Sequence, residues 1–365
     1  MNKFTASSLV DSNKAISFDD IMIVPTDSSV ISRSNPSTSS VIASSLTLDI
    51  PVISSPMDTV TGSDMAKEMS VNGAAGIIHR FASKEDQSLM IQSMIDTQEY
   101  EGDLGGLKVI PAIGVGNSEK DRFEFLYRKF GDKLTAVAVD VANGDSGYMR
   151  DMVMWLKRNV PNLPVIAGNV ATGEAFNRLS DAGANAIRVG IGGGSICKTR
   201  IMTGIGVPTL SSVIDCVHHR SLYGDSSVSI IADGGIRYPA DFVKSLAVGA
   251  DAIIAGRIFA GTIESPGDIS IVNGVKTKVY RGMASKEVQD DKRGGLRPGT
   301  CAEGVSTYIP LKGKAKYVLN DFSGGLRSAM TYVNALNLQE LRDNSRFIKI
   351  TASGLDESHA FGTKI

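Results

Sequence analysis

The feature that most limits what this chain can fold into is a pattern repeated along its whole length. Short apolar runs end in Gly, Asp, Asn or Ser, and longer amphipathic stretches separate them. Eight runs have this form: 50–57, 74–80, 109–116, 136–144, 164–172, 186–195, 228–235 and 252–261. Their glycines gather after the sixth, seventh and eighth runs, whereas an open dinucleotide-binding sheet carries them after the first strand. We therefore predict an α/β fold, a (β/α)8 TIM barrel, with its active site at the ends of the runs.

We predict a single barrel domain over residues 1–365. The connection between Gln87 and Val109, roughly twenty residues, is too short for an inserted regulatory domain. The segment at about 281–310 is polar and rich in glycine and charge, and a loop of this length after the eighth run predicts a flap over the active-site face. We expect the polar tail, about 351–365, to fray or to dock on a neighbouring subunit.

Composition excludes several classes of partner. With 38 Lys+Arg against 39 Asp+Glu, the net charge of −1 argues against a surface that wraps nucleic acid or binds anionic membranes. The chain has neither a signal-peptide pattern nor a stretch of about 18 apolar residues. Three widely spaced cysteines predict no disulfide framework, so we expect a cytoplasmic protein. None of the four histidines has metal-ligand spacing, which predicts no transition metal.

The most informative stretch runs from Gly190 to Arg200 and reads GIGGGSICKTR. Its glycines let backbone N–H groups converge on an anion, and Ser195 adds a hydroxyl donor. Cys197 follows at the rim of this cradle. The cationic side chains of Lys198 and Arg200 favour its thiolate form, so we predict that Cys197 is a nucleophile rather than a buried structural cysteine.

The other candidates for this chemistry are less distinctive. Cys216 lies in a helix-like stretch and fits a core position, whereas Cys301 lies on the flap and fits an exposed one. Glu303, also on the flap, is a candidate acid or base together with Thr199, although a flap glutamate is more often only solvated.

Polar residues close three further runs. The seventh and eighth runs end in Asp-Gly-Gly and Ala-Gly-Arg, where barrel enzymes commonly hold a phosphate. Asp233 can accept hydrogen bonds from a ribose diol, so a nucleoside monophosphate would satisfy both demands. The fourth run ends at Asp140 and Asn143, which offer a carboxylate and a carboxamide to the same face, unless the aspartate is a helix cap.

Several stretches together carry a resemblance to a known family: FDDIMIVP (18–25), SSPMDTVT (54–61), VDVANG, AGNVAT, VGIGGGSICKTR, ADGGIR, YRGM (280–283), AEG (302–304) and GGLRSAMTY (324–332). They resemble the inosine-5′-monophosphate (IMP) dehydrogenases and guanosine-5′-monophosphate (GMP) reductases along nearly the whole chain. The resemblance implies a homotetrameric barrel that acts on a purine nucleoside monophosphate. It also implies that Cys197 attacks C2 of the purine to form a covalent thioimidate.

The resemblance assigns the remaining site residues. It implies that the nucleotide is bound by Ser55, Met57, Ser195, Gly234, Gly235, Gly256, Arg257, Tyr280, Gly282 and Met283, and its ribose by Asp233. Asp140, with Asn143 and Gly144, would lie near the nicotinamide. The tail GLDESHAF resembles one that completes a potassium site between subunits, from Gly192, Gly194 and Cys197 of one chain and Glu357, Ser358 and His359 of the next.

The flap separates the two branches of the family. A dehydrogenase hydrolyses its thioimidate with water activated by an Arg-Tyr pair in the flap, and no tyrosine occurs here between Tyr280 and Tyr308. A reductase expels ammonia and needs a proton relay, which Thr199 and Glu303 match. The sequence thus favours an NADPH-dependent reductase that converts GMP or dGMP to IMP.

Two alternatives remain open. ADGGIR, VYRGM and the tail resemble a dehydrogenase, which converts IMP, NAD⁺ and water to xanthosine monophosphate (XMP) and NADH. Arg297 is then the first candidate for activating water. A non-catalytic sensor of purine nucleotides is the third reading. The chain departs from the family at Gly193, usually proline, at Lys198, usually threonine, and at Arg257, usually a small residue.

Overall fold

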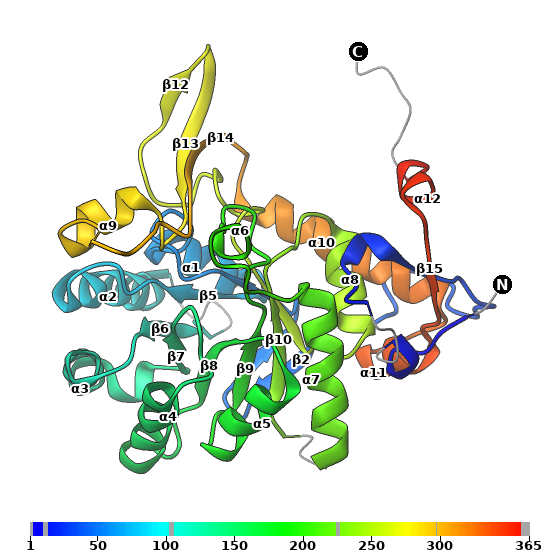
Figure 1. Cartoon of the computed structure of the whole chain (residues 1–365), viewed down its shortest axis with the longest axis horizontal. Coiled ribbons are helices and arrows are strands. Elements are labelled where there is room, and N and C mark those ends of the chain that lie inside the picture. The colour runs from blue at the N-terminus through cyan, green and yellow to red at the C-terminus, as the bar shows by residue number, and fades with distance from the viewer. Residues whose placement is uncertain (1–2, 10–13, 102–105, 224–226, 297, 359–365) are drawn as a thin grey trace.

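Eight parallel strands form a closed barrel in the computed structural model, which describes residues 3–9, 14–101, 106–223, 227–296 and 298–358 (Figure 1). Each strand lies within one of the eight predicted runs. They are β4 (Val52–Ser54), β5 (Ala75–Ile78), β6 (Val109–Ile113), β7 (Val137–Asp140), β8 (Val165–Val170), β9 (Ala186–Val189), β10 (Ser229–Asp233) and β11 (Ala252–Ala255). The ring closes by pairing of β11 with β4. The predicted (β/α)8 barrel is confirmed.

Helices cover the outside of the barrel. They are α1 (Ser63–Val71), α2 (Lys84–Glu101), α3 (Asn117–Phe130), α4 (Gly147–Asn159), α5 (Gly173–Asp181), α7 (Thr209–Tyr223), α8 (Pro239–Ala247) and α10 (Ala315–Tyr332). Helix α2 fills much of the connection between Gln87 and Val109. Helix α4 shows why these stretches are helical: Ser146 caps its first turn, and Met149, Met152 and Leu156 recur on one buried face. Among the described helices, none has both the length and the apolar character needed to cross a membrane.

A small hairpin closes the amino end of the barrel. It consists of β2 (Ser40–Ala43) and β3 (Leu46–Leu48), and its buried side chains join the apolar cluster that fills the barrel interior. The Ser40 hydroxyl donates to the carbonyl of Asp251, and the Ser45 hydroxyl to that of Thr135, just before strands β11 and β7 begin. The functional residues therefore gather at the opposite, carboxyl end.

The segment after β11 forms more structure than the sequence predicted. Strands β12 (Ser270–Val272), β13 (Val275–Arg281) and β14 (Ser306–Pro310) make an antiparallel sheet, and its β12–β13 hairpin projects from the barrel (Figure 1). The flap contains helix α9 (Lys286–Arg293). Strand β12 and the turn into β13 are largely exposed, and this part of the segment lacks the apolar run by which the barrel strands were recognised.

The two ends of the described chain pack together. Strand β1 (Ile21–Ile23) pairs antiparallel with β15 (Phe347–Lys349), which follows helix α11 (Leu338–Asn344). Beyond it, α12 (Ala352–Asp356) contacts the 3-10 helix η2 (Phe18–Asp20). Helix α12 thus contacts its own chain, whereas Glu357 and Ser358 beyond it are exposed. Docking of the tail on a neighbouring subunit remains a prediction.

The hairpin at the amino end yields a stability prediction. Leu46 is fully buried against the barrel interior, so Leu46→Ala should lower the free energy of unfolding by about 2–5 kcal/mol. Val41, on the same hairpin, is 66% exposed, and Val41→Ala should change it by no more than about 0.5 kcal/mol. Denaturant unfolding measures both. Equal effects of the two substitutions would contradict the assignment of this hairpin to the barrel core.

Candidate active site

The loop that carries Cys197 connects β9 to the short helix α6 (Thr199–Thr203). The Cys197 sulfur lies 3.1 Å from the Thr199 hydroxyl oxygen, and the cysteine is half-buried. The end of the flap runs antiparallel beside this loop: the Lys198 amide donates to the Glu303 carbonyl at 2.7 Å, and Cys197 pairs with Gly304. The structure therefore brings the three predicted catalytic residues together and ties Glu303 to the cysteine loop through the backbone.

The side chain of Arg200 does not lie as expected for a residue that stabilises the Cys197 thiolate. Its side chain folds back between Gly192 and Gly206, where added Cβ atoms would lie 2.7 and 2.5 Å from Arg200 Cγ. Its guanidinium donates to the Val207 carbonyl. The expectation that Arg200 favours the Cys197 thiolate is not supported by this geometry, since the charge is directed at the connection after α6. Lys198 is exposed beside the cysteine.

The predicted phosphate cradle combines residues from four segments. The Ser195 hydroxyl oxygen lies 3.3 Å from that of Tyr280, and burial raises the pKa of Tyr280, so the phenol stays protonated at neutral pH. A Cβ atom on Gly256 would lie 3.1 Å from both the Tyr280 hydroxyl and the Met57 sulfur, and 3.6 Å from the Ser55 Cβ. The absence of a Cβ atom at Gly256 therefore allows a closer approach than most side chains would permit.

The loops after β9 and β10 also contact each other closely through their glycines. Gly234 and Gly235 have φ of +93° and +81°, and a Cβ on Gly234 would lie 3.1 Å from the Gly193 carbonyl carbon. A Cβ on Gly193 would in turn lie 2.4 Å from the Thr209 hydroxyl at the start of α7. A proline at this position, which the family resemblance would lead us to expect, would therefore collide with Thr209 unless that side chain moved.

Asp233 is held by two residues that the sequence analysis missed. Its Oδ2 atom accepts hydrogen bonds from Arg188 Nη2 at 2.7 Å and Asn169 Nδ2 at 2.8 Å. Arg188 Nη1 donates to Asp140 Oδ1 at 2.5 Å. Burial alone would lower the pKa of Arg188, but the charges of Asp140 and Asp233 outweigh it and raise this pKa. A charged residue inside the apolar run 186–189 was the available signal.

The remaining cofactor candidates differ in character. Asp140, at the end of β7, has a side chain 16% exposed beside Arg188. Gly144 packs closely on β8, since its added Cβ would lie 3.0 Å from the Asn169 carbonyl oxygen. Asn143 is exposed, and its side-chain oxygen accepts from the Asp145 amide in a turn. Of the three, Asp140 is therefore the best candidate for a side-chain contact with the nicotinamide cofactor.

Residues after β11 add positive charge beside the cradle. Arg257 is exposed, and its carbonyl accepts a hydrogen bond from Lys312 Nζ at 2.6 Å. Burial, with a smaller contribution from the charge of Arg257, lowers the pKa of Lys312 to about 8. On the flap side, the Gly282 amide donates to Val305, which places Gly282 and the half-buried Met283 next to the cysteine loop. Arg257 and Lys312 suit an anion at this end of the cradle.

Comparison with known proteins identifies the family. Residues 15–361 match the model described as the IMP dehydrogenase / GMP reductase domain. The chain belongs to this family.

Relatives align over different lengths. The inosine-5′-monophosphate dehydrogenase of Borreliella burgdorferi is 34% identical over 398 aligned positions, which cover 95% of this chain and 96% of the relative. That of Cryptosporidium parvum is 36% identical over 398 positions, with 96% of each chain covered. That of Chlorobaculum parvum is 42% identical over 265 positions, but these span 70% of this chain and only 52% of the relative. The chain thus covers about half of that longer family member.

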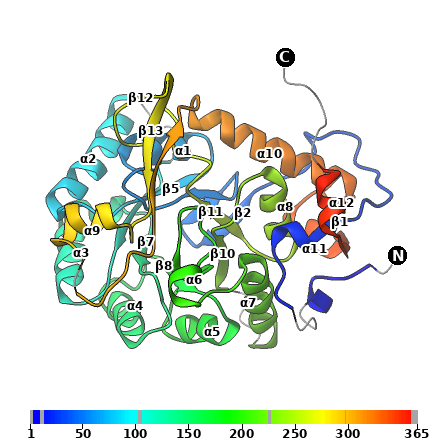
Figure 2. The same cartoon turned by 45° about the horizontal axis from the view of Figure 1, so that its top comes forward.

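The two halves of the predicted potassium site lie apart within one chain. Gly192, Gly194 and Cys197 lie on the loop before α6, whereas Glu357 and Ser358 follow α12 and are exposed. Figures 1 and 2 both show α12 well separated from α6. His359 lies outside the described residues. Joining the halves would need a second subunit, as the family resemblance implies.

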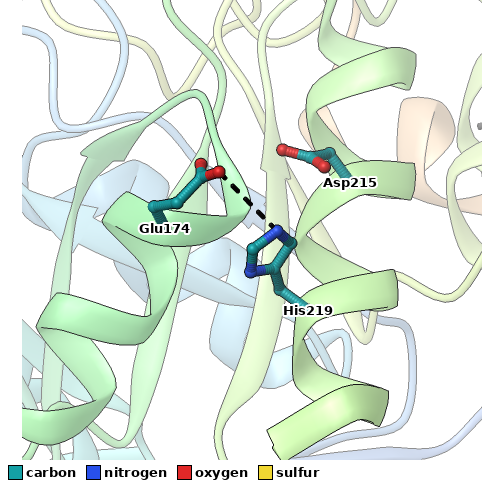
Figure 3. Close-up of side chains that lie close together, drawn as sticks. All are labelled: Glu174, Asp215 and His219. Carbon is teal, nitrogen blue, oxygen red and sulfur yellow. Dashed lines mark ion pairs between the residues drawn. The ribbon is translucent and has the colours of Figure 1, made fainter.

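A second polar cluster lies on the outside of the barrel, between α5 and α7 (Figure 3). Ligand atoms of Glu174, Asp215 and His219 lie within 4.8 Å of one another, although sequence spacing gave no sign of it. Asp215 accepts from the Gly173 amide at 2.7 Å and so caps α5, and Glu174 lies in the first turn of that helix. Because a helix amino terminus attracts carboxylates, the cluster is explained without a metal.

The environments of the three cysteines predict different responses to substitution. Cys197→Ala should abolish turnover, because it removes the sulfur beside Thr199, while nucleotide affinity should stay within about tenfold. Cys216 is buried, which raises the pKa of its thiol, so Cys216→Ala should mainly lower thermal stability. The exposed Cys301 provides the control, Cys301→Ala, which should retain activity. Full activity of Cys197→Ala would exclude a cysteine mechanism here.

Proposed function

We propose that the protein oxidises IMP to XMP, with Cys197 as the nucleophile and NAD⁺ as the hydride acceptor. The observation that carries this proposal is the position of Cys197, 3.1 Å from Thr199 on a glycine cradle against which the flap packs. Membership of the family restricts the chemistry to purine nucleotide redox reactions. The Borreliella burgdorferi and Cryptosporidium parvum relatives, aligned over 95–96% of this chain, are named as dehydrogenases, which favours this direction over reduction.

In the proposed mechanism, Ser195, Tyr280 and the backbone around Gly256 bind the phosphate of IMP, and Asp233 binds the ribose. The thiolate of Cys197 adds to C2 of the purine, and a hydride leaves C2, which gives the thioimidate. Asp140 would hold the nicotinamide nucleotide, which would supply the acceptor for that hydride. Water then adds to C2, and the C2–S bond breaks to release XMP and the Cys197 thiolate. The balance is IMP, NAD⁺ and water to XMP, NADH and a proton.

The chain's own residues fit the cofactor and the proton transfers. Asp140 commits Oδ1 to Arg188, while Oδ2 is 3.8 Å from Arg80 Nε, so an oxygen remains for a hydroxyl or amide of the nicotinamide nucleotide. Thr199 and Glu303, joined to the cysteine loop, are the candidates to move protons at C2 and at the sulfur.

GMP reduction is the second candidate because of one observation on the flap. Between Tyr280 and Tyr308 the sequence contains no tyrosine, so the water-activating Arg-Tyr pair that the family resemblance implies for a dehydrogenase is missing. Arg297, the suggested substitute, lies outside the described residues. In this direction Cys197 would displace ammonia from C2 of GMP or dGMP. Hydride supplied by NADPH would then add to C2, and the departing thiolate would leave IMP.

Turnover assays separate the two candidates. With IMP and NAD⁺, we expect steady formation of XMP over many turnovers without added ammonium. The absorbance of the reduced nicotinamide measures the rate. A reductase would instead form at most about one equivalent of NADH per site and then resume when ammonium is added, and it would consume NADPH with GMP. Binding of both nucleotides with no turnover in either direction would indicate a sensor.

Glu303 tests the proton relay in whichever direction turns over. Glu303→Gln removes a titratable group held beside the Cys197 loop, and should lower kcat by about 10²–10⁴-fold, or roughly 3–5 kcal/mol. Glu287, on α9 of the same flap, is exposed, so Glu287→Gln serves as the matched control and should leave kcat nearly unchanged. Similar rates for the two variants would exclude Glu303 from the relay.

We further propose a homotetramer in which tails bind potassium between subunits. Carbonyl oxygens are suitable ligands for such a cation, and the loop of Gly192, Gly194 and Cys197 would offer them together with the neighbour's Glu357, Ser358 and His359. Turnover should then be faster in potassium than in sodium, and truncation after Ser353 should remove the difference. Light scattering measures the assembly. Equal rates in both salts with an active truncated form would contradict this proposal.

A further inference from the structure

Arg188 connects two carboxylates that the proposed function assigns to different ligands. Its Nη2 and Nε atoms donate to Asp233 Oδ2 at 2.7 and 3.2 Å, and its Nη1 atom donates to Asp140 Oδ1 at 2.5 Å. Asp233 ends β10 and would hold the ribose of the purine nucleotide. Asp140 ends β7 and would face the nicotinamide nucleotide. One guanidinium therefore spans the boundary between the two halves of the site.

The barrel is built to hold this side chain in place. Arg188 is only 4% exposed, in the middle of β9. Its strand neighbour in register is Gly168, where an added Cβ would lie 2.6 Å from Arg188 Cβ and 2.8 Å from its carbonyl oxygen. The guanidinium is a rigid planar fork, so fixing one of its edges fixes the direction of the other. A lysine at this position would keep the charge but lose the bridging geometry.

Each carboxylate keeps an oxygen for a ligand. Within the described chain, the hydrogen bonds to the Asp233 side chain all fall on Oδ2, from Arg188 and from Asn169. The Asp140 side chain accepts from Arg188 through Oδ1, and its Oδ2 lies 3.8 Å from Arg80 Nε. A ligand hydroxyl bound to Asp233 Oδ1, or to Asp140 Oδ2 beside Arg80, would thus restrict a carboxylate that is already joined to the other through Arg188.

We propose that Arg188 is a positioning residue that couples the two ligands, so that a purine nucleotide bound at Asp233 raises the affinity for a nicotinamide dinucleotide at Asp140, and the reverse. The first ligand orders the Asp233–Arg188–Asp140 bridge, and the second ligand then binds a carboxylate whose orientation is already set. This inference rests on the proposed function for the identity of the two ligands, but not on which direction the reaction takes.

The test uses the full-length chain with Cys197→Ala, which binds ligands without covalent chemistry. Calorimetry measures the Kd for IMP without NADH and with saturating NADH. In this parent we expect NADH to tighten IMP binding by about tenfold. Adding Arg188→Lys should reduce that factor below about threefold, a change that a purely structural role of the arginine would not produce. A factor that stays within twofold of the parent value would overturn the inference.

A matched arginine controls for the loss of a buried ion pair. Arg220 has a side chain 14% exposed and pairs with Asp251 at 2.6 Å, at the opposite end of the barrel. Arg220→Lys in the same background should keep the tenfold factor, and its loss there would overturn the assignment to Arg188. If Arg188→Lys does not fold by circular dichroism, Asp140→Asn replaces it and should also reduce the factor below about threefold.

The proposed function and this inference fail in different ways. If neither IMP nor NADH binds the Cys197→Ala parent, the proposed function is wrong and the coupling with it. If both bind but neither alters the Kd of the other, the proposed function stands and the coupling through Arg188 is wrong.

Discussion

Hydrogen bonding between neighbouring strands closes eight parallel strands into one ring, and this closure positions the loops that carry candidate site residues. Because every strand runs in the same direction, all carboxyl ends meet at one rim, and the loops after them converge. Residues separated by more than 200 positions, such as Met57 and Tyr280, thereby approach the same glycine. The β2–β3 hairpin fills the other end with apolar side chains. One end of the barrel is therefore part of the hydrophobic core, and the opposite end carries the candidate active site.

Close backbone contacts, rather than long side chains, shape the nucleotide cradle. Gly193 and Gly234 let the loops after β9 and β10 touch, and Gly256 lets a buried tyrosine reach the loop of Met57. The flap joins this arrangement through main-chain hydrogen bonds at Lys198 and Val305. The backbone of Glu303 is therefore held beside the cysteine loop by strand-like pairing. This pairing restricts the position of Glu303 more than a free loop would.

Buried charge is the second organising principle of the site. Arg188 inside the barrel is tolerated because Asp140 and Asp233 balance it, and removing one partner would leave an uncompensated buried charge. The same bridge fixes two carboxylates that face the proposed ligands. Stability of the barrel interior and orientation of the binding groups therefore depend on one set of hydrogen bonds.

The barrel could be predicted from the sequence, because periodic apolar runs and the glycines at their ends are local signals that can be read without knowledge of tertiary contacts. The position of Cys197, Ser195 and Gly256 directly after predicted strands was enough to predict a nucleophile and a phosphate cradle. Which side chains come into contact could be seen only in the folded barrel. Arg188 and Asn169 were not predicted because their partners are 45 and 64 positions away. The hydrogen bond from Arg200 to the Val207 carbonyl was not predicted either, because it depends on how the chain folds back after α6. Such pairings are set by barrel closure and by the packing of one loop on another, which are properties of the whole ring and not of any single segment.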